Sequence, residues 1–274
     1  MISLDEDAIR GLLSEAVAAR LAGFETFPEI ESTNSYLMQR EGPPPGQACV
    51  AVTDNQTMGR GRHGRTWQSP PGSGLCISVA YTFAAQPANL PALTLAIGLG
   101  AIDALEDMGV PGVQLKWPND LIADDGKLGG ILTESRSQAS GAISVVTGIG
   151  LNVDLGEDLD FGIETDWARR VTDLAGLAGE LPSRDALAAR LINGLCTTFV
   201  DYEAGEFDRF VHKWPDRDWL FGRELTIDTP HRQVTGVGAG VADDGALLVD
   251  TGSGELSRIT SGSVVMAGIR GTSA

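Results

Sequence analysis

Residues 59–67 read GRGRHGRTW, and this stretch decides which class of fold the chain can adopt. Gly59, Gly61 and Gly64 satisfy the pattern G-x-G-x-x-G, which in a dinucleotide-binding fold opens a helix whose N-terminus faces pyrophosphate. Here QSPPGSG (68–74) follows, and its two prolines and two glycines do not continue a helix. A Walker A loop is excluded too, because the Gly-Lys-Ser/Thr that ends one is missing. The stretch is therefore a loop in another kind of fold.

The flanking segments predict an α+β protein with a mixed or antiparallel sheet and helices on one face, because single helices interrupt the strands without strict alternation. A helix opened by Pro91 is expected to run to about Gly109, and a long helix is expected after a cap at Ser183. Ser3 and Glu6 fit a capping box and predict one N-terminal helix of about 18 residues. The segment 75–83, rich in β-branched and aromatic residues, predicts a strong strand, the segment 49–56 is expected to begin as a strand, and further strands are expected at 113–117, 129–135 and 142–153.

The character of the sequence changes near Trp219. From Gly222 onward it contains only short strand-like segments, and Asp243-Asp244-Gly245 is a good hairpin turn. We therefore expect two domains, a main one over 1–220 and a small β-barrel over 221–274. Residues 154–170 are acidic, contain two glycines and are predicted to form a loop.

The net charge of −17 over 274 residues argues against a general nucleic-acid or membrane-surface role, which would need a cationic face. The predicted N-terminal helix leaves no room for a helix-turn-helix, so no DNA-binding domain is expected. No apolar run approaches the length of a membrane span. Cys49, Cys76 and Cys196 are widely spaced in apolar runs, which is typical of buried thiols in a reducing compartment and predicts a cytoplasmic protein.

Two cationic motifs stand out in this acidic chain. Arg60, Arg62 and Arg65 are the only Lys or Arg residues between Arg40 and Lys116. Taken alone, such a loop is most simply a solubilising surface segment. The second motif, QLKWPNDLIADDGKLGGIL (114–132), holds two of the three lysines in the chain. A lysine that ends a strand just before a Trp-Pro turn is well placed to point into a cleft and bind a carboxylate or phosphate.

Two further segments have both a functional and a structural interpretation. The glycines of GIGLNV (148–153) suggest close approach of a ligand, or a bulge with a satisfied Asn152. In ESTNSYL (31–37), Ser32, Thr33 and Asn34 offer hydrogen-bonding groups, or cap a helix. HKWPD (212–216) repeats Lys-Trp-Pro where a long helix closes, and we interpret it as structural.

The chain resembles the biotin–protein ligases, also called biotin–[acetyl-CoA-carboxylase] ligases, in five motifs that occur in this order: ESTN, Gln56 with GRGRHGRTW, KWPNDL, KLGGIL and GIGLNV. The resemblance extends from about residue 27 to the C-terminal barrel. The resemblance implies a catalytic domain like that of class II aminoacyl-tRNA synthetases, followed by an SH3-like β-barrel. It implies joining of biotin to ATP as biotinyl-5′-adenylate with release of pyrophosphate, and transfer of biotin to a lysine of a biotin carboxyl carrier domain. The chain resembles members without an N-terminal DNA-binding domain.

The resemblance also implies roles for individual residues. Lys116 and Arg62 are expected to be catalytic, Lys116 by bridging the biotin carboxylate and the α-phosphate, and Arg62 by holding the intermediate. ATP chemistry implies Mg²⁺, whose ligands the motifs do not identify. Biotin binding is expected of Ser32, Thr33, Asn34, Gln56, Gly59, Arg60, Gly61, Lys116 and Gly130. Binding of ATP or the adenylate is expected of Arg62, Arg65, Trp67, Asn119, Lys127 and Asn152.

The chemistry explains why an acidic protein needs a cationic loop. A carboxylate must attack a phosphate, and two anions repel more strongly in a cleft than in water. Backbone N–H groups of a glycine-rich loop and the forked donors of its arginines can offset that repulsion. We expect Arg62 and Lys116 to share one pocket, and residues 59–67 to close over the ligand and exclude water. A lipoate or octanoate ligase of related fold and a non-catalytic biotin sensor remain the alternatives.

Overall fold

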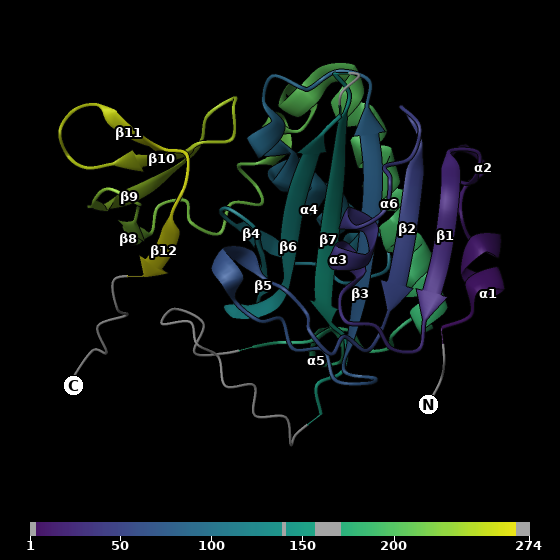
Figure 1. Ribbon diagram of the computed structural model, residues 1–274. Coiled ribbons are helices and arrows are strands. Elements are labelled where there is room, and N and C mark those ends of the chain that lie inside the picture. Colours follow the sequence, from purple (N-terminus) through teal and green to yellow (C-terminus); the bar gives the residue numbers. More distant parts are fainter. Residues whose placement is uncertain (1–3, 139–140, 157–170, 267–274) are drawn as a thin grey trace.

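The computed structural model describes residues 4–138, 141–156 and 171–266, which form two β-sheets with helices packed on the larger one (Figure 1). The larger sheet has the strand order β1-β2-β3-β7-β6-β5-β4. Its strands are β1 Leu21–Phe27, β2 Ala48–Thr53, β3 Gly74–Phe83, β4 Gln114–Lys116, β5 Asp120–Ala123, β6 Gly126–Ser137 and β7 Ile143–Asn152. β1 and β2 run parallel and the other neighbours antiparallel, so the expected mixed sheet of an α+β protein is confirmed.

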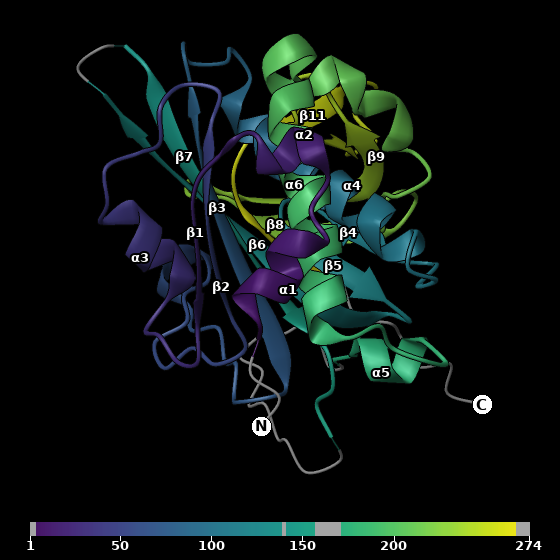
Figure 2. The same ribbon diagram turned by 90° about the vertical axis from the view of Figure 1, so that its right-hand side faces the viewer.

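The helices lie on both faces of this sheet (Figure 2). They are α1 Glu6–Gly11, α2 Glu15–Ala18, α3 Thr33–Met38, α4 Leu93–Glu106, α5 Leu174–Leu177 and α6 Arg184–Gly205. The long helices α4 and α6 share one face with α1 and α2, as expected, whereas the short α3 covers the opposite face. Within the described residues, no helix combines the length and apolar character needed to cross a bilayer.

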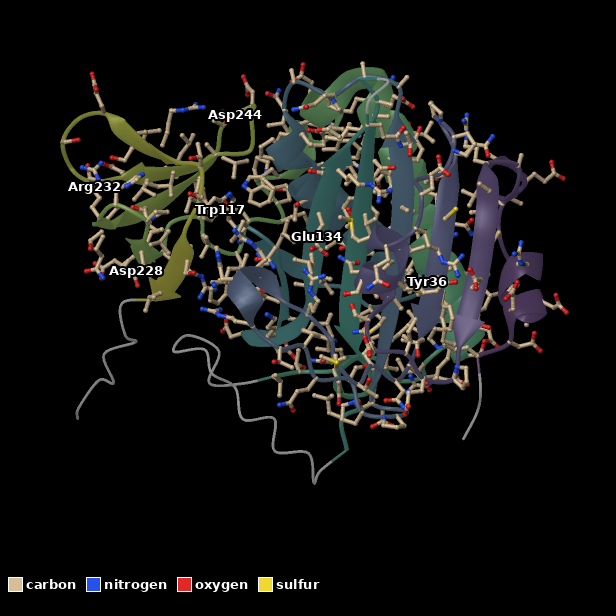
Figure 3. The ribbon with its side chains drawn as sticks, in the orientation of Figure 1. Tyr36, Trp117, Glu134, Asp228, Arg232 and Asp244 are labelled. Atoms are coloured by element: carbon tan, nitrogen blue, oxygen red, sulfur yellow. The ribbon has the colours of Figure 1, made fainter. Side chains whose placement is uncertain are left out.

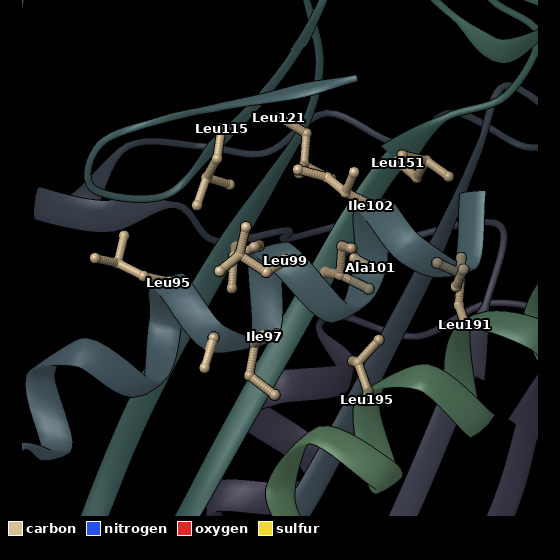
Figure 4. Close-up of a cluster of buried hydrophobic side chains, with 14 of the residues drawn as sticks. Leu95, Ile97, Leu99, Ala101, Ile102, Leu115, Leu121, Leu151, Leu191 and Leu195 are labelled. Atoms are coloured by element: carbon tan, nitrogen blue, oxygen red, sulfur yellow. The ribbon is translucent and has the colours of Figure 1, made fainter. Parts of the chain in front are cut away.

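Helix α4 is buried on nearly all sides because it packs on β4 and β6 of the sheet and lies beside α6 (Figure 4). Its sequence, LTLAIGLGAIDALE, has apolar residues all round, which is typical of a core helix and not of an amphipathic surface helix. Gly100 of α4 lies against Thr198 of α6, where an added Cβ would overlap the hydroxyl oxygen. The close packing of the two helices therefore depends on a glycine.

The single N-terminal helix predicted from the sequence is wrong. The chain forms α1, capped by the Asp5 carboxylate, and then α2, capped by the Ser14 hydroxyl. Ser14 also donates its backbone N–H to Asn193 Oδ1 at 3.0 Å, which ties the break to α6. A serine that caps a new turn ends the first helix although the apolar period continues. Ser3, the predicted cap, and most of the predicted loop 154–170 lie outside the described residues.

The C-terminal module is an antiparallel sheet in the order β11-β10-β9-β8-β12. Its strands are β8 Glu224–Asp228, β9 Gln233–Val241, β10 Leu247–Asp250, β11 Leu256–Ile259 and β12 Ser263–Met266. The hairpin turn at Asp243-Asp244-Gly245 is confirmed, since Gly245 has a φ of 80° and donates its N–H to Ala242 O at 2.8 Å. The domain boundary at 220/221 stays a prediction.

The connection between the two sheets is well packed. After α6, short 3₁₀ turns at Glu206–Arg209 and Val211–Lys213 lead to Trp214. The Trp214 indole is buried and donates to Asp218 Oδ2 at 2.9 Å, which agrees with a structural role for HKWPD. Asp218 in turn forms a parallel bridge with Leu115 of β4. The connection therefore extends the edge of the main sheet toward the C-terminal module.

Replacing Gly100 by leucine should lower the free energy of unfolding by about 1–3 kcal/mol, because the new side chain must separate α4 from α6. Gly11→Leu is the matched control, since it also replaces a helical glycine but a Cβ there meets no atom within 4 Å. Urea denaturation of both variants gives the comparison. Equal stabilities for the two variants would show that the α4–α6 contact does not need a glycine.

Candidate functional site

A cavity of about 450 Å³ lies where the glycine–arginine loop, α3, the β4–β5 turn, β6, β7 and β12 meet. It brings together residues that are far apart in the sequence, including Arg62 and Lys116. The predicted site residues that line it are Ser32, Thr33, Asn34, Gln56, Arg60, Gly61, Arg62, Arg65, Trp67, Lys116, Asn119, Lys127, Gly130 and Asn152. Of the predicted set only Gly59 does not line the cavity. The individual roles stay predictions.

The loop 59–67 is a short hairpin-like turn and not the start of a helix. Gly61 donates its N–H to Arg65 O at 2.8 Å, and Trp67 donates to Gly59 O at 2.9 Å. A Cβ at Gly59 would overlap the Trp67 carbonyl, so Gly59 is needed to close the turn. His63 has a φ of 55°, in the left-handed region. This conformation carries the loop arginines along one side of the cavity.

The glycines of β7 make room for two side chains of the protein. A Cβ at Gly150 would lie 2.6 Å from Trp67 Nε1, so the indole packs directly on the strand. A Cβ at Gly148 would lie 2.9 Å from Asn34 Cγ. Close approach was predicted here, but for a ligand. The glycines instead allow Trp67 and Asn34 to form the floor of the cavity.

A network of neutral polar groups forms one end of the cavity. Gln56 Oε1 accepts from the backbone N–H of Thr33 at 2.9 Å and from its hydroxyl at 3.2 Å. Ser78 lies 2.7 Å from Thr33 Oγ1 and donates to Asn34 Oδ1 at 2.7 Å. Ser32 caps α3, so its helix-cap interpretation is confirmed. Ser78 was missed, although a serine inside the apolar strand 75–83 is a signal that could have identified it.

Lysines and one carboxylate form the other end. Lys116 is 3% exposed, and its Nζ donates to the backbone oxygen of Val264 in β12 at 3.3 Å. The Asp120 carboxylate lies 3.9 Å from Lys116 Nζ and 2.7 Å from Lys127 Nζ. Arg62 donates to Asn119 Oδ1 at 3.2 Å. Asp120 was not among the predicted site residues, yet it is the counter-ion that connects both lysines.

Burial makes the positive charge of Lys116 costly in the free protein. It lowers the pKa of Lys116 from 10.5 to about 7, an effect that the Asp120 carboxylate opposes and the cations Lys127, Arg65 and Arg62 reinforce. Burial also lowers the pKa of Arg62. An anion entering this end of the cavity would favour the charged form of both groups. The arrangement is therefore suited to binding a carboxylate or phosphate.

Three predicted residues are held by protein groups. Arg60 donates to Glu134 Oε1 at 2.5 Å and to Ser35 Oγ at 3.1 Å, which fastens the loop to β6 (Glu134 is labelled in Figure 3). Asn152 donates to the backbone oxygens of Lys127 and Thr172 at 3.1 and 3.0 Å. Asn119 donates to Ile131 O at 2.9 Å. Both asparagines thus shape the wall through backbone contacts.

Two family models match the sequence. The first, described as the Biotin/lipoate A/B protein ligase family, matches residues 26–154. The second, the Biotin protein ligase C terminal domain, matches residues 220–266. Together they span the motifs that line the cavity and most of the second sheet.

Proteins of known function are similar to most of this chain. The biotin--[acetyl-CoA-carboxylase] ligase of Mycobacterium tuberculosis is 30% identical over 268 residues, covering 96% of this chain and 95% of that protein. The bifunctional ligase/repressor BirA of Salmonella typhimurium is 33% identical over 248 residues, covering 90% of this chain and 73% of that protein. A solved biotin protein ligase from Aquifex aeolicus, in complex with biotin and ATP, has a TM-score of 0.74 at 26% identity and covers 90% of this chain and 100% of that one.

We expect Gly150→Ala to displace the Trp67 indole from β7 and to lower the free energy of unfolding by about 1–3 kcal/mol. Gly130→Ala is the control, because Gly130 pairs directly with Gly150 across β6 and β7 but its Cβ would make only ordinary contacts at 3.6 Å. Denaturation and the NMR signal of the Trp67 indole N–H measure both effects. An unmoved indole signal in Gly150→Ala would refute the packing described for Trp67.

Proposed function

Since the chain belongs to the biotin protein ligase family, we propose that it activates biotin with ATP and transfers the biotinyl group to a lysine of a biotin carboxyl carrier domain. The observation that carries this proposal is the convergence of Arg62 and Lys116 on one cavity, opposite the polar end formed by Thr33 and Gln56. The test is a mass increase of one biotinyl group on a carrier domain incubated with this protein, biotin and Mg-ATP. An unmodified carrier domain would contradict the proposal.

The first step joins two anions. A carboxylate oxygen of biotin attacks the α-phosphorus of ATP, and the bond to pyrophosphate breaks as pyrophosphate leaves with the electron pair. Two unit charges of like sign at 4 Å repel by about 4 kcal/mol at an effective dielectric constant near 20. Lys116 and Arg62 offset this repulsion because both are held in the cavity before the substrates arrive.

The second step forms an amide. The neutral Nζ of the acceptor lysine attacks the carbonyl carbon of biotinyl-5′-adenylate, and the carbon–oxygen bond to phosphate breaks. AMP leaves with the electron pair, and the new amide nitrogen loses its proton to water. Water itself would destroy the adenylate, so closure of the loop 59–67 protects the intermediate until the lysine reaches it.

ATP brings Mg²⁺ as its counter-ion in this proposal. In residues 4–138, 141–156 and 171–266, no group of three or more His, Cys, Asp or Glu side chains is arranged to hold a metal. We therefore expect phosphate oxygens and water to supply most of its ligands. The free thiols of Cys49, Cys76 and Cys196 support a cytoplasmic location, and the net charge of −17 supports a protein that does not bind DNA.

A lipoate or octanoate ligase is the nearest alternative, since one matched family model includes lipoate ligases. Calorimetric titration with biotin and with lipoate separates the two, and tighter binding of lipoate would favour the alternative. A non-catalytic biotin sensor would bind biotin but release no pyrophosphate from ATP.

Lys116→Met should reduce biotin-dependent ATP–pyrophosphate exchange by at least about 100-fold, because a buried charge that stabilises a transition state contributes about 3 kcal/mol. Lys213→Met is the control, because Lys213 pairs with Asp103 at 2.6 Å outside the cavity. Its exchange rate should equal that of the wild type. A near-normal exchange rate in Lys116→Met would show that another residue supplies the essential positive charge.

The affinity for biotin should depend on pH through Lys116. The pKa of Lys116 is about 7 in the free protein, and a bound carboxylate raises it, so binding above pH 7 requires uptake of a proton. Affinity should therefore be highest below about pH 7 and fall as the pH rises toward about pH 9. Calorimetry should show this decline in the wild type and a flat profile in Lys116→Met. A flat wild-type profile would contradict the assignment.

Hydrogen exchange tests closure of the loop. Amide protons of residues 59–67 should exchange more slowly with biotin or the adenylate bound, because the closed loop excludes water. Helix α6 is the internal control, since its residues line neither cavity. Equal exchange rates for the loop in both states would rule out a closing role.

A further inference from the structure

A second cavity, of about 350 Å³, lies between the N-terminal end of α4 and the C-terminal sheet. It shares Arg62, Pro118, Asn119 and Ile131 with the first cavity, so these residues form a common wall. Trp117 and Asp244, both lining residues, lie at the junction of the two sheets (Figure 3). The second cavity therefore adjoins the first at Arg62, and Thr33 and Gln56 line only the first cavity.

The central part of the second cavity is lined largely by apolar side chains. Leu95, Trp117 and Ile131 are each at most 2% exposed. The hydroxyls of Thr94 and Thr133 are hydrogen-bonded to each other at 2.9 Å. Such walls suit a flexible hydrocarbon chain better than a polyanion.

The charged residues of its lining are Arg62 and Asp244. Arg62 lies in the common wall, where it donates to Asn119. The Asp244 side chain is 41% exposed, which places it near solvent, and it pairs with Arg258 at 2.7 Å. With one positive and one negative group, the lining lacks the excess of positive charge that a polyanion such as pyrophosphate needs.

We propose that the second cavity admits the aliphatic primary-amine side chain of the acceptor lysine to the adenylate carbonyl at Arg62. The inference rests on the proposed function and deepens it, since biotin and the nucleotide occupy the first cavity when the acceptor arrives. The lysine stem packs on Leu95 and Trp117, its ammonium enters past Asp244 at the solvent side, and it loses a proton to water before attack. The amide bond to the lysine forms as the bond between the biotinyl carbonyl carbon and the phosphate oxygen breaks, and AMP leaves with the electron pair.

This assignment also gives the C-terminal module a function. Trp117 donates its indole N–H to Gly245 O at 3.0 Å, which holds the β9–β10 turn against the main sheet. Gly245 itself packs on Ala92, where a Cβ would come within 2.8 Å of the alanine Cβ. The module thus completes the second cavity through its β9–β10 turn, and it holds Lys116 through β12.

The test fills the second cavity and measures the two steps separately. Ala88→Trp and Thr94→Trp each place a bulky ring in its wall, and Ala88 is exposed, so its replacement spares the core. Ala85→Trp is the matched control, because Ala85 is exposed nearby and lines neither cavity. ATP–pyrophosphate exchange measures the first step. Single-turnover transfer from preformed biotinyl-5′-adenylate to a carrier domain measures the second, with hydroxylamine as a small acceptor that needs no channel.

Both filled variants should keep wild-type exchange and hydroxylamine reaction but transfer biotin to the carrier domain at least tenfold more slowly. Ala85→Trp should match the wild type throughout. Normal transfer by both filled variants overturns the inference and leaves the proposed function intact. Loss of exchange in the filled variants also overturns it, because the second cavity would then serve the first step. Wild-type protein without biotin-dependent exchange would instead contradict the proposed function.

Discussion

The site depends on keeping the Lys116 ammonium out of water. The short β4–β5 hairpin places it under the C-terminal strand β12, where a backbone oxygen and the Asp120 carboxylate contact it at 3.3 and 3.9 Å. Burial and three neighbouring cations lower its pKa to about 7, so its charge is poorly stabilised until an anion arrives. A carboxylate or phosphate placed there would raise the pKa of Lys116 and favour its charged form. Arg62, held by Asn119 on the loop side, is under the same constraint.

The two modules act as one unit at this point. Strand β12 supplies the oxygen that contacts Lys116, and the β9–β10 turn accepts a hydrogen bond from Trp117 in the same hairpin segment. The connection through Trp214 and Asp218 fixes the second sheet beside β4. The residues Lys116-Trp117-Pro118 therefore lie between two sheets, and each sheet contributes a wall to both cavities. This explains why a lysine at the end of a three-residue strand can be almost completely buried.

Much of the fold and the cavity could be predicted because the strongest signals are local. Neighbouring residues in the sequence are enough to predict the apolar strand 75–83, the core helix after Pro91 and the cationic motifs. The errors came where a tertiary contact decides. Ser14 caps a second helix beside Asn193, and β5 exists through its register with β4 and β6. The same register, not sequence spacing, brings Asp120 between Lys116 and Lys127. Glu134 could not be predicted as a partner of Arg60, because their contact depends on how the loop 59–67 folds against β6.

The most direct test of this account is the pKa of Lys116, measured by NMR on protein labelled with ¹⁵N-lysine. The chain has three lysines, Lys116, Lys127 and Lys213, so their side-chain signals can be assigned by single substitutions. We expect the Lys116 Nζ to titrate at about pH 7 in the free protein and several units higher with a non-hydrolysable biotinyl-adenylate analogue bound. A pKa near 10.5 in both states would contradict it, because the cavity would then hold no poorly stabilised charge for the substrates to relieve.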